Sequence, residues 1–459
     1  MTSDLRDQLE PLVAAWLPAQ RWFAGKGRDA RITLDPVAEL PGDQVTIWVA
    51  RAAYDDGAVE TYQCPLVLHA EPSEGLEHVL LGSIDDVDGP RYVYDALHDK
   101  DVTAGWLTGI RDELGTGPIR FTRYAEPDDI PVDQPSLVLT VEQSNTSLMY
   151  GDVAILKVFR RLQPGVNPDI EIHAALGERG AVHVPRLLGS VTAQIGSDEF
   201  ALAMLQEYMT TATDGWELAK TSVRDLMAEA DLHAEEAGGD LAGEAFRLGE
   251  TVAEVHAELA EVFGVAPSRP DELADRVAAM RIRLDTALTI VPELAEVADA
   301  LHAAYDALGA ASSEVLLQRI HGDLHLGQAL RTMLRWVLID FEGEPMAEIG
   351  ERRRPDPPLR DVAGMLRSFD YAGHHRVIET GYQPQLAYRA DEWTQRNREA
   401  FLAGYASVAE HDPREHPVPL RAFEADKAVY EAVYETRNRP SWLPIPLASL
   451  ARLTQADQR

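Results

Sequence analysis

The sequence contains a single cysteine, Cys64, among 459 residues. One thiol cannot form an intramolecular disulfide or supply a multi-cysteine zinc or iron–sulfur site, and we expect Cys64 to be a small buried core residue. The sequence also lacks an apolar run of the roughly 18 residues that a membrane-spanning helix needs. Its first ten residues, MTSDLRDQLE, have neither the basic region nor the apolar stretch of a signal peptide. These absences predict a cytoplasmic protein.

Positive charge is scarce as well. Lys and Arg total 42 against 76 Asp and Glu, which gives a formal net charge of −34. Such a surface repels phosphate polymers and anionic lipid, so we expect neither nucleic acid nor membrane as a partner. An anionic cofactor would need a local positive site or a metal ion. Only five of the cations are lysines: Lys26, Lys100, Lys157, Lys220 and Lys427. Each lysine is therefore a candidate for a specific role.

The composition is that of a folded protein, with 45% hydrophobic and 26% charged residues. The length allows two to four domains at roughly 100 to 200 residues each. Apolar spacing and turn residues predict an N-terminal helix and then alternating strands in 1–88, a short helical region around 93–114 and a Pro/Asp-rich turn at 125–136. Strands are predicted in 137–159, and mostly helices from about 212 onward. The expected class is therefore α+β. Helices are predicted at 269–288, 293–308, 361–372, 391–408 and 420–437, with short strands near 316–320 and 336–340.

The densest polar cluster is HGDLHLGQ (His321–Gln328), followed twelve residues after Gln328 by Asp340 in IDFEGEP. Each cluster follows an apolar, strand-like stretch. Two strands ending side by side would bring Asp323, Gln328 and Asp340 into one cleft. Phosphoryl transfer from ATP requires a carboxylate that accepts the proton of the attacking hydroxyl and oxygen ligands for Mg²⁺. We assign Asp323 as the base and Gln328 and Asp340 as metal ligands. The order and spacing resemble the kinase motifs HRDxxxxN and DFG.

Upstream, Lys157 in AILK interrupts an apolar strand, as in the VAIK strand of kinases, whose lysine contacts ATP phosphates. An ionised lysine in such a place needs a partner, and Glu171 at a predicted helix start is the expected one. We therefore assign Lys157 and Glu171 to the nucleotide site. Asp361, in LRDVA, begins another predicted helix. Its simpler interpretation is an N-cap, and the alternative is a brace for the catalytic loop.

The polar turn that follows strand 137–141 stands where a kinase carries its glycine-rich phosphate loop. It has no glycine, but side-chain hydroxyls and amides together with backbone N–H groups can hold phosphate oxygens. The predicted phosphate-loop residues are Gln143, Ser144, Asn145, Thr146 and Ser147. The segment that contains Gln206, Glu207 and Tyr208 falls at a strand-to-helix changeover, where a kinase hinge would bind adenine through its backbone.

These residues carry a resemblance to the actinobacterial maltokinases, within the aminoglycoside-phosphotransferase-like kinases. It extends over nearly the whole chain, through segments that include QRWFAGKGR, EQSNTS, AILKVFRR, NPDIE, HGDLHLGQ, IDFEGEP and YETRNRPSWLPIPL. The resemblance implies a bilobal protein-kinase-like fold with an N-terminal cap subdomain in 1–88, an intermediate subdomain in 89–130, an N-lobe in 131–208 and a helical C-lobe in 209–459. It also implies ATP- and Mg²⁺-dependent phosphorylation of the anomeric hydroxyl of maltose, for α-glucan synthesis from trehalose.

A sugar site in the C-lobe follows from the same resemblance. Its candidate residues combine an aromatic face with hydrogen-bonding ends, which suits a disaccharide: His325, Glu431, Tyr434, Arg437 and Trp442. A trehalose-isomerising enzyme, trehalose synthase, is the implied protein partner, and a monomer or weak homodimer is the expected state. Because nothing resembles an activation loop after Asp340, a small-molecule acceptor fits better than a protein.

Three alternatives remain open. A related kinase for another sugar or aminosugar, such as glucosamine, would share the same core residues, and Glu431 provides a carboxylate for an amine. A hydrolase could use His321, Asp323, His325 and Asp340 as zinc ligands, but this gives Lys157 and Glu171 no role. A non-catalytic nucleotide- or glucan-binding protein would not need both the base and the metal ligands.

Overall fold

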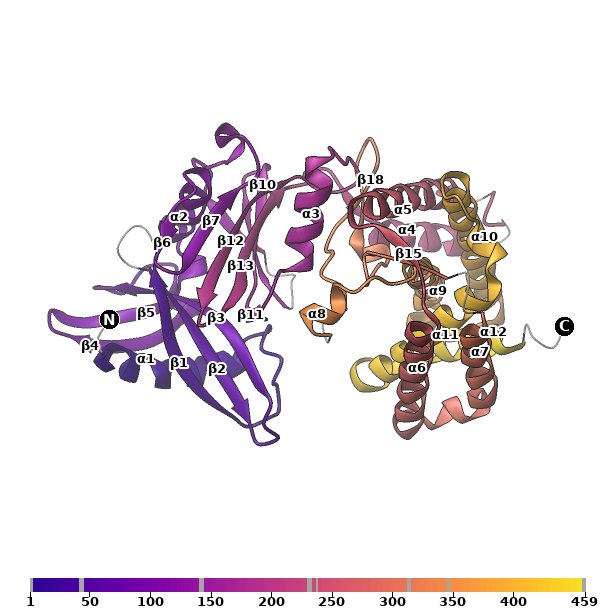
Figure 1. Cartoon of the computed structure of the whole chain (residues 1–459), viewed down its shortest axis with the longest axis horizontal. Coiled ribbons are helices and arrows are strands. Elements are labelled where there is room, and N and C mark those ends of the chain that lie inside the picture. The colour runs from indigo at the N-terminus through magenta and orange to yellow at the C-terminus, as the bar shows by residue number, and fades with distance from the viewer. Residues whose placement is uncertain are drawn as a thin grey trace. The chain divides into compact units, whose positions relative to one another are not determined.

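The computed structural model describes residues 3–40, 45–139, 144–228, 233–236, 238–311, 315–344 and 347–455. The chain forms two compact units (Figure 1). The first comprises residues 1–177, 185–210 and 348–350, and the second comprises 178–184, 211–347 and 351–459. Strands dominate the first unit and helices the second, which confirms the α+β class. Among the described residues, no helix has both the length and the apolar character needed to cross a membrane.

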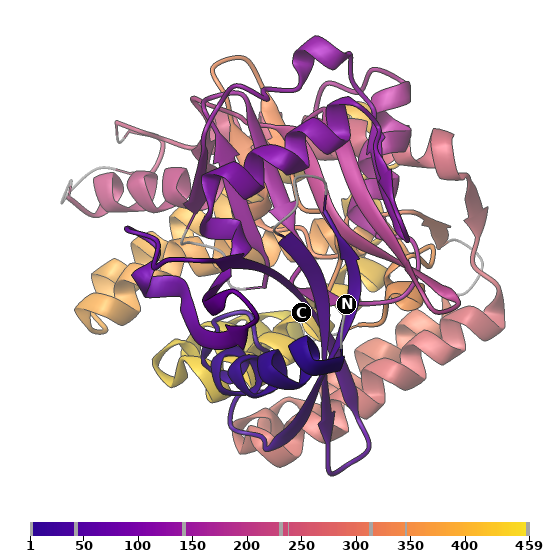
Figure 2. The ribbon, with the colours of Figure 1, turned by 90° about the vertical axis from the view of Figure 1, so that its left-hand side faces the viewer.

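The first unit begins with an antiparallel sheet in the order β1-β2-β3-β5-β4, with β11 paired to β3. Its strands are β1 (Ala30–Glu39), β2 (Val45–Tyr54), β3 (Val59–His69), β4 (Leu80–Asp86), β5 (Gly89–Asp95) and β11 (Arg161–Leu162). Helix α1 (Ser3–Trp16), the indigo helix in Figure 2, packs on β1 and β4. Its residues Leu9 and Val13 are one helical turn apart and fully buried, as the apolar spacing predicted.

Strand β2 is apolar on both faces because each face meets a different core. Ile47 and Val49 belong to the core shared with the next sheet, whereas Trp48 and Ala50 belong to the core under α1. Successive side chains of a strand point to opposite faces, so a strand between two cores reads as a continuous apolar run. Cys64 lies fully buried in the α1 core, and burial raises the pKa of its thiol to about 12. It is the small core residue that the sequence predicted.

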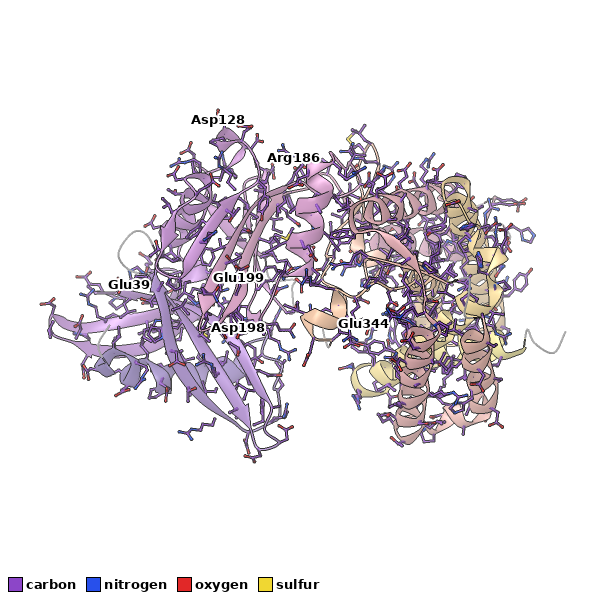
Figure 3. The ribbon with its side chains drawn as sticks, viewed as in Figure 1. Glu39, Asp128, Arg186, Asp198, Glu199 and Glu344 are labelled. Atoms are coloured by element: carbon purple, nitrogen blue, oxygen red, sulfur yellow. The ribbon has the colours of Figure 1, made fainter. Side chains whose placement is uncertain are left out.

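A second antiparallel sheet of this unit has the order β6-β7-β12-β13-β10-β9-β8. Its strands are β6 (Gly115–Thr116), β7 (Ile119–Arg123), β8 (Ser136–Leu139), β9 (Thr146–Tyr150), β10 (Ala154–Val158), β12 (Leu187–Ile195) and β13 (Asp198–Glu207). Asp198 and Glu199, at the start of β13, are labelled in Figure 3. The helices of this part are α2 (Lys100–Arg111) and α3 (Pro168–Glu178). Leu139 pairs with Ser147 across β8 and β9, so the predicted phosphate-loop turn connects two neighbouring strands.

The second unit is mainly helical. Its helices include α4 (Gly215–Ala228), α5 (Ala242–Phe263), α6 (Pro270–Ile290), α7 (Ala298–Ala310), α9 (Leu359–Thr380), α10 (Pro384–Val408), α11 (Pro417–Asn438) and α12 (Pro444–Gln455), while the short α8 (Ile349–Arg352) crosses the boundary between the units. The five predicted helices are present with shifted ends. Helices α5 and α10 approach closely at glycines: a Cβ on Gly404 would lie 1.9 Å from the carbonyl oxygen of Phe246.

Short strands in this unit correct one expectation. The predicted strand near 316–320 is β16 (Leu316–Gln318), which pairs with β15 (Val265–Pro267) and not with the strand before Asp340. Instead, β17 (Ala329–Arg331) pairs with β18 (Trp336–Leu338), and β14 (Thr213–Asp214) extends this sheet. Because β17 begins directly after Gln328 and β18 ends shortly before Asp340, a tight hairpin, and not two strands ending in parallel, brings these two side chains together.

Candidate active site

Asp361 of α9 fixes the start of the loop His321–Gln328 through hydrogen bonds to the loop backbone. The Asp361 carboxylate accepts hydrogen bonds from the backbone N–H groups of His321, at 2.7 Å, and Gly322, at 2.9 Å. His256 Nε2 lies 3.1 Å from the same carboxylate. Gly322 has a φ of +86°, in the left-handed region that favours glycine. Burial opposes ionisation of Asp361, but the hydrogen bonds and charge of His256 outweigh it and lower the pKa.

The N-cap interpretation of Asp361 is therefore wrong. Helix α9 begins at Leu359, and the residue at its N-cap position is Pro358. Asp361 lies within the first turn, where its fully buried side chain points to the loop and not to its own helix end. The alternative interpretation, a brace for the catalytic loop, matches the observed hydrogen bonds.

Asp323 forms a partly buried ion pair with Lys427 of α11. Lys427 Nζ donates a hydrogen bond of 2.9 Å to Asp323 Oδ1. Burial opposes the charge on Asp323, but Lys427, His325 and His321 outweigh burial and lower its pKa. Burial also opposes the charge on Lys427, yet Asp323, Glu344 and Glu431 raise its pKa. The pair therefore keeps Asp323 ionised, as a proton acceptor must be.

His325 lies beside this pair. Burial lowers its pKa, which favours the neutral imidazole. Its Nδ1 accepts a hydrogen bond of 3.1 Å from the backbone N–H of Gly327, so the proton of the neutral ring is on Nε2. His325 can therefore offer an N–H donor to a substrate oxygen.

The structure brings Gln328 and Asp340 together. Gln328 Nε2 donates a hydrogen bond of 2.9 Å to Asp340 Oδ2. Asp340 has a φ of +69°, a conformation that non-glycine residues adopt rarely and that is found at functional sites. The backbone around it is fixed by His321, whose Nε2 lies 2.9 Å from Ile339 O and whose ring lies 4.6 Å from that of Phe341.

This donor set fits a Mg²⁺ ion. Because the amide nitrogen of Gln328 makes the hydrogen bond to Asp340, its amide oxygen is the group suited to a cation. Amide and carboxylate oxygens are the hard ligands that Mg²⁺ prefers, usually with phosphate oxygens and water completing the shell. The positive φ of Asp340 is a local strain that this binding role would explain.

A cavity beside Asp323 is lined by charged groups that are paired with one another. Its wall includes Asp323, Leu324, Glu344, Asp426, Lys427 and Tyr430. Arg360 lies 3.2 Å from Glu344, which Figure 3 labels, and Arg283 lies 2.9 Å from Asp426. Asp323 is paired with Lys427 and Asp361 with His256. Each carboxylate that lines this cavity therefore has a cationic or imidazole partner.

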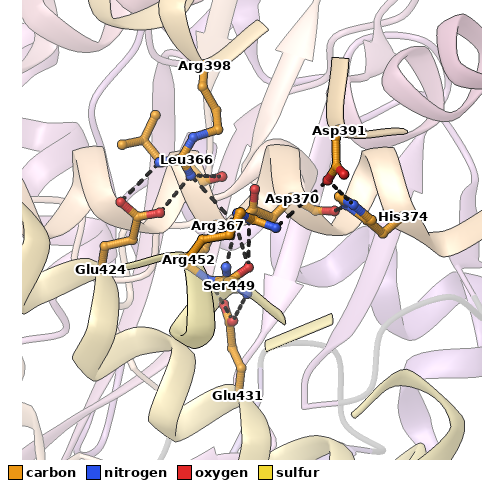
Figure 4. Close-up of polar contacts among 10 residues, drawn as sticks. All are labelled: Leu366, Arg367, Asp370, His374, Asp391, Arg398, Glu424, Glu431, Ser449 and Arg452. Carbon is orange, nitrogen blue, oxygen red and sulfur yellow. Dashed lines mark hydrogen bonds and ion pairs between the residues drawn. The ribbon is translucent and has the colours of Figure 1, made fainter. Parts of the chain in front are cut away.

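Glu431, one helical turn after Lys427, belongs to a buried network of ion pairs (Figure 4). Its Oε2 accepts hydrogen bonds from Arg367 Nε at 2.9 Å and pairs with Arg367 Nη2 at 2.7 Å. Burial raises the pKa of Glu431, although Arg367 acts in the opposite direction. The predicted sugar-contacting carboxylate is thus already bound on one side by a guanidinium.

The other candidate sugar-binding residues lie at the end of α11 and after it. Tyr434 and Arg437 are exposed. Trp442 stacks on Tyr371 with ring centroids 6.1 Å apart, and its ring is 6.5 Å from that of Trp216. The Arg439 guanidinium lies 4.5 Å from the Trp442 ring centroid. Aromatic rings and hydrogen-bonding groups therefore occur together here, as sugar binding requires.

Sequence reasoning missed several of these residues, and Lys427 is the most important. One signal could have identified it: Lys427 is one of only five lysines and precedes Glu431 by four residues, on the same helical face. Arg367 and Arg439 gave no such signal, because the chain uses arginine for most of its positive charge.

In the first unit, Lys157 is buried and its Nζ donates a hydrogen bond of 3.2 Å to Asp169 Oδ2. The sequence predicted Glu171 as the partner of Lys157. Asp169, which makes this hydrogen bond, lies two residues before Glu171. Asn167 explains the local geometry, because its side-chain oxygen accepts hydrogen bonds from the N–H groups of Asp169 and Ile170 and caps α3. The cap places Asp169 in the first turn, where a carboxylate is favoured by the helix dipole.

The predicted phosphate-loop residues overlap the start of strand β9. Gln143 lies outside the described residues, and Ser144 and Asn145 precede strand β9. Thr146 and Ser147 are the first two residues of that strand and are buried, and Ser147 stands opposite Lys157 in the β9–β10 register. The turn and the lysine strand are therefore adjacent in this unit.

The Thr146 hydroxyl accepts a hydrogen bond of 2.8 Å from Arg160 Nε. Arg160 is itself buried and forms an ion pair of 2.5 Å with Asp95. The first residue of β9 is thus fixed by a buried side-chain contact.

In the predicted hinge, two backbone donors are already in use. The N–H of Glu207 donates to Arg186 O and the N–H of Tyr208 donates to Val153 O, each at 2.9 Å. Gln206 is the register partner of Ile155 in β10. Backbone recognition of adenine here would have to use other groups of the segment.

Comparisons with known proteins show the family to which the chain belongs. A family described as "Phosphotransferase enzyme family" matches residues 140–411, more than half of the chain, and one described as "Maltokinase N-terminal cap domain" matches residues 16–99. A glucosamine kinase of Streptacidiphilus jiangxiensis is 31% identical over 85% of this chain and 91% of its own length. A glucosamine kinase of Mycolicibacterium smegmatis is 31% identical over 69% of this chain and 78% of its own length.

The fold comparison gives the same relationship. A solved structure of a glucosamine kinase in complex with glucosamine, ADP and inorganic phosphate aligns with a TM-score of 0.69 and 25% identity, covering 97% of this chain and 98% of the other.

Proposed function

Because the chain belongs to the phosphotransferase enzyme family, we propose that it is an ATP-dependent sugar kinase that phosphorylates the anomeric hydroxyl of maltose. The products are maltose 1-phosphate and ADP, and the product would serve α-glucan synthesis from trehalose. The match of residues 16–99 to a maltokinase cap domain and the motifs HGDLHLGQ and DFEGEP support maltose. The observation that carries the choice of acceptor is the pairing of every carboxylate lining the Asp323 cavity.

In the proposed reaction, Asp323 accepts the proton of the anomeric hydroxyl as its oxygen attacks the γ-phosphorus of ATP, and the bond to the β-phosphate oxygen breaks to release ADP. Lys427 holds Asp323 in place by their 2.9 Å hydrogen bond. His325, as a neutral N–H donor, orients a sugar oxygen, and Lys157 neutralises phosphate charge. Gln328 and Asp340 would hold Mg²⁺, which supplies neutralisation of the ATP phosphate charge when bound. The chain contributes mainly positioning and electrostatics.

A neutral acceptor fits the electrostatics of the cavity. An aminosugar carries an ammonium group, which binds best to a carboxylate whose charge is not already compensated. In this cavity Asp323, Glu344 and Asp426 each have a cationic partner, and Glu431 is paired with Arg367. A polar but uncharged sugar can still donate hydroxyl hydrogen bonds to paired carboxylates. These features favour maltose over glucosamine.

A second candidate is supported by the named relatives. The two relatives described above are glucosamine kinases, and one matches over 91% of its length. A glucosamine kinase would use Asp323, Gln328 and Asp340 in the same roles and would direct its amine to a carboxylate such as Glu431.

The decisive experiment measures ADP release from the purified protein with Mg-ATP and maltose, glucose, glucosamine, trehalose or no sugar, with phosphorus NMR of the product. We expect strong maltose-dependent release and a phosphate on the anomeric carbon. Release with glucosamine alone would keep the kinase chemistry and transfer the specificity to the second candidate. If none of the four sugars stimulates ADP release, the proposed class of acceptor is wrong.

A further inference from the structure

Arg367 occupies an unusual place for an arginine. It is fully buried in α9 and bridges two carboxylates, Glu431 of α11 and Asp370 of its own helix (Figure 4). Its Nη1 lies 2.5 Å from Asp370 Oδ2, and its Nε and Nη2 lie within 3 Å of Glu431 Oε2. One buried cation therefore compensates two buried anions, one of which is a candidate sugar-binding group.

Asp370 has further partners that do not depend on Arg367. Ser449 of α12 donates a hydrogen bond of 2.7 Å to Asp370 Oδ2, and Arg452 of the same helix lies 2.9 Å from it. Arg398 of α10 lies 3.6 Å away and is paired more closely with Glu424, at 2.6 Å. Within the described residues, Glu431 forms an ion pair with Arg367 alone. Removing the Arg367 charge would therefore leave Asp370 compensated but uncover Glu431.

The charge count supports the same conclusion. Around Arg367, the cations Arg367, Arg398 and Arg452 balance the carboxylates Asp370, Glu424 and Glu431 in formal charge. Asp391 lies 4.0 Å from Arg452 at the edge of the cluster and is closer to His374, at 3.0 Å. A balanced cluster offers little attraction to an incoming cation, whereas a carboxylate with one oxygen bound by arginine can still accept hydrogen bonds from neutral hydroxyls. Lys427 and its positive charge lie one turn before Glu431 on α11 and add to the repulsion of a cation.

We propose that Arg367 is a specificity-determining residue, which cancels the charge of Glu431 so that the acceptor site prefers an uncharged sugar to a cationic aminosugar. The proposal rests on the proposed function and on the predicted sugar site, to which Glu431 is assigned. Arg367 is too deeply buried to meet the sugar and acts through Glu431. Binding sites often gain specificity by making the interaction with the wrong ligand unfavourable. Here the ammonium of an aminosugar would find no uncompensated carboxylate.

The test compares glucosamine with glucose, because these sugars differ at one substituent, an ammonium in place of a hydroxyl. Each is measured as a competitive inhibitor of maltose phosphorylation, and the readout is the ratio of the two inhibition constants. In Arg367→Met, glucosamine should bind more tightly relative to glucose by about tenfold or more, because Glu431 loses its arginine partner and an ammonium beside it favours the ionised carboxylate against the burial that raises its pKa. In Glu431→Gln, which leaves Arg367 paired with Asp370 alone and removes one negative charge from the cluster, glucosamine should bind more weakly relative to glucose.

Opposite directions in the two variants separate charge recognition from damage to the fold, since damage weakens both sugars alike. Arg367→Lys, which keeps the charge, should keep the ratio of the wild type. Arg396→Met is the matched control, because Arg396 pairs with Asp240 and shares no partner with Glu431. If Arg367→Met does not fold, Glu431→Gln still decides the matter, because it removes only one charge and keeps the side-chain shape.

The role of Arg367 is overturned if the ratio of inhibition constants stays at the wild-type value in both Arg367→Met and Glu431→Gln. Where Arg367→Met does not fold, an unchanged ratio in Glu431→Gln has the same meaning. That result is distinct from failure of the proposed function. The latter appears in the wild type itself, as phosphorylation of glucosamine in preference to maltose.

Discussion

Lys427 Nζ lies 2.9 Å from Asp323 Oδ1, although the two residues are 104 positions apart in the sequence. The contact joins α11 to the loop that carries the candidate base. Both side chains are about three-quarters buried, at 23% and 25% exposure, so solvent screens the pair less than it screens a surface salt bridge. This pairing accounts for the lowered pKa of Asp323 despite its burial.

Replacing Lys427 should change the pH dependence of the reaction. Lys427→Met removes the main group that lowers the pKa of Asp323, so this pKa should rise. A base with a raised pKa is protonated at a higher pH, and the acidic limb of the kcat/KM profile should therefore move to higher pH. Lys220→Met is the control, because Lys220 pairs with Glu217 on the surface of α4. A profile that keeps its acidic limb in Lys427→Met would show that Lys427 does not tune the base.

Asp323 itself should be essential for turnover. Asp323→Asn keeps the size of the side chain but removes the proton acceptor, and kcat should fall by about 10²- to 10⁴-fold. Binding of ATP, measured by calorimetry, should be largely unchanged because Asp323 acts on the acceptor. Near-normal turnover in this variant would remove Asp323 from the role of base.

Asp361 should stabilise the folded protein, and its contribution should depend on pH. Asp361→Ala leaves the buried N–H groups of His321 and Gly322 without their acceptor, which should cost about 3 kcal/mol in the free energy of unfolding. The pKa of Asp361 is lowered in the folded protein, so its contribution is present above the pKa of the unfolded chain and is lost as the pH falls through the folded value. Urea titrations at several pH values measure both effects. A stability difference from wild type that does not shrink toward acid pH would contradict this account.

Lys157 should act on the nucleotide. In Lys157→Ala, the KM for ATP should rise by about tenfold or more while the KM for the sugar changes little, because a buried phosphate-binding cation is lost. Asp169→Asn is the companion variant: it keeps Lys157 but weakens the contact that holds it at 3.2 Å, so a smaller change in the same direction is expected. Equal effects on the two substrates would count against the assignment.

The packing of α5 against α10 gives a prediction that is independent of catalysis. A Cβ at Gly404 would overlap the carbonyl oxygen of Phe246, and backbone cannot move aside as a side chain can. Gly404→Ala should therefore lower the free energy of unfolding by about 3 kcal/mol, at the upper end of the cost of overpacking. The control is Gly177→Ala in α3, where nothing lies within 4 Å and alanine should stabilise the helix by about 0.5 to 1 kcal/mol. Chemical denaturation of both variants measures the difference.

The local features of this protein follow from the sequence because they depend on neighbours along the chain. Helical spacing predicted helices at 391–408 and 420–437, and the structure has α10 and α11 there, with starts shifted by prolines at positions 384 and 417. The burial of Cys64 and of Lys157 followed from the apolar stretches around them. The motif order around Asp323, Gln328 and Asp340 was likewise sufficient to identify a candidate phosphotransfer site.

Partners that are distant in the sequence were decided by the tertiary structure alone. Periodicity shows which face of a helix is buried but not which charge it meets, so the pairs Asp323–Lys427 and Arg367–Glu431, 104 and 64 positions apart, left no readable pattern. The same reason explains why Asp361 braces the loop and does not cap its own helix. Its carboxylate accepts hydrogen bonds from N–H groups that are 39 and 40 positions away in the sequence. The sequence thus determined the elements and the candidate reacting groups. Packing decided the charge state and the neighbours of those groups, because electrostatics acts through space and not along the chain.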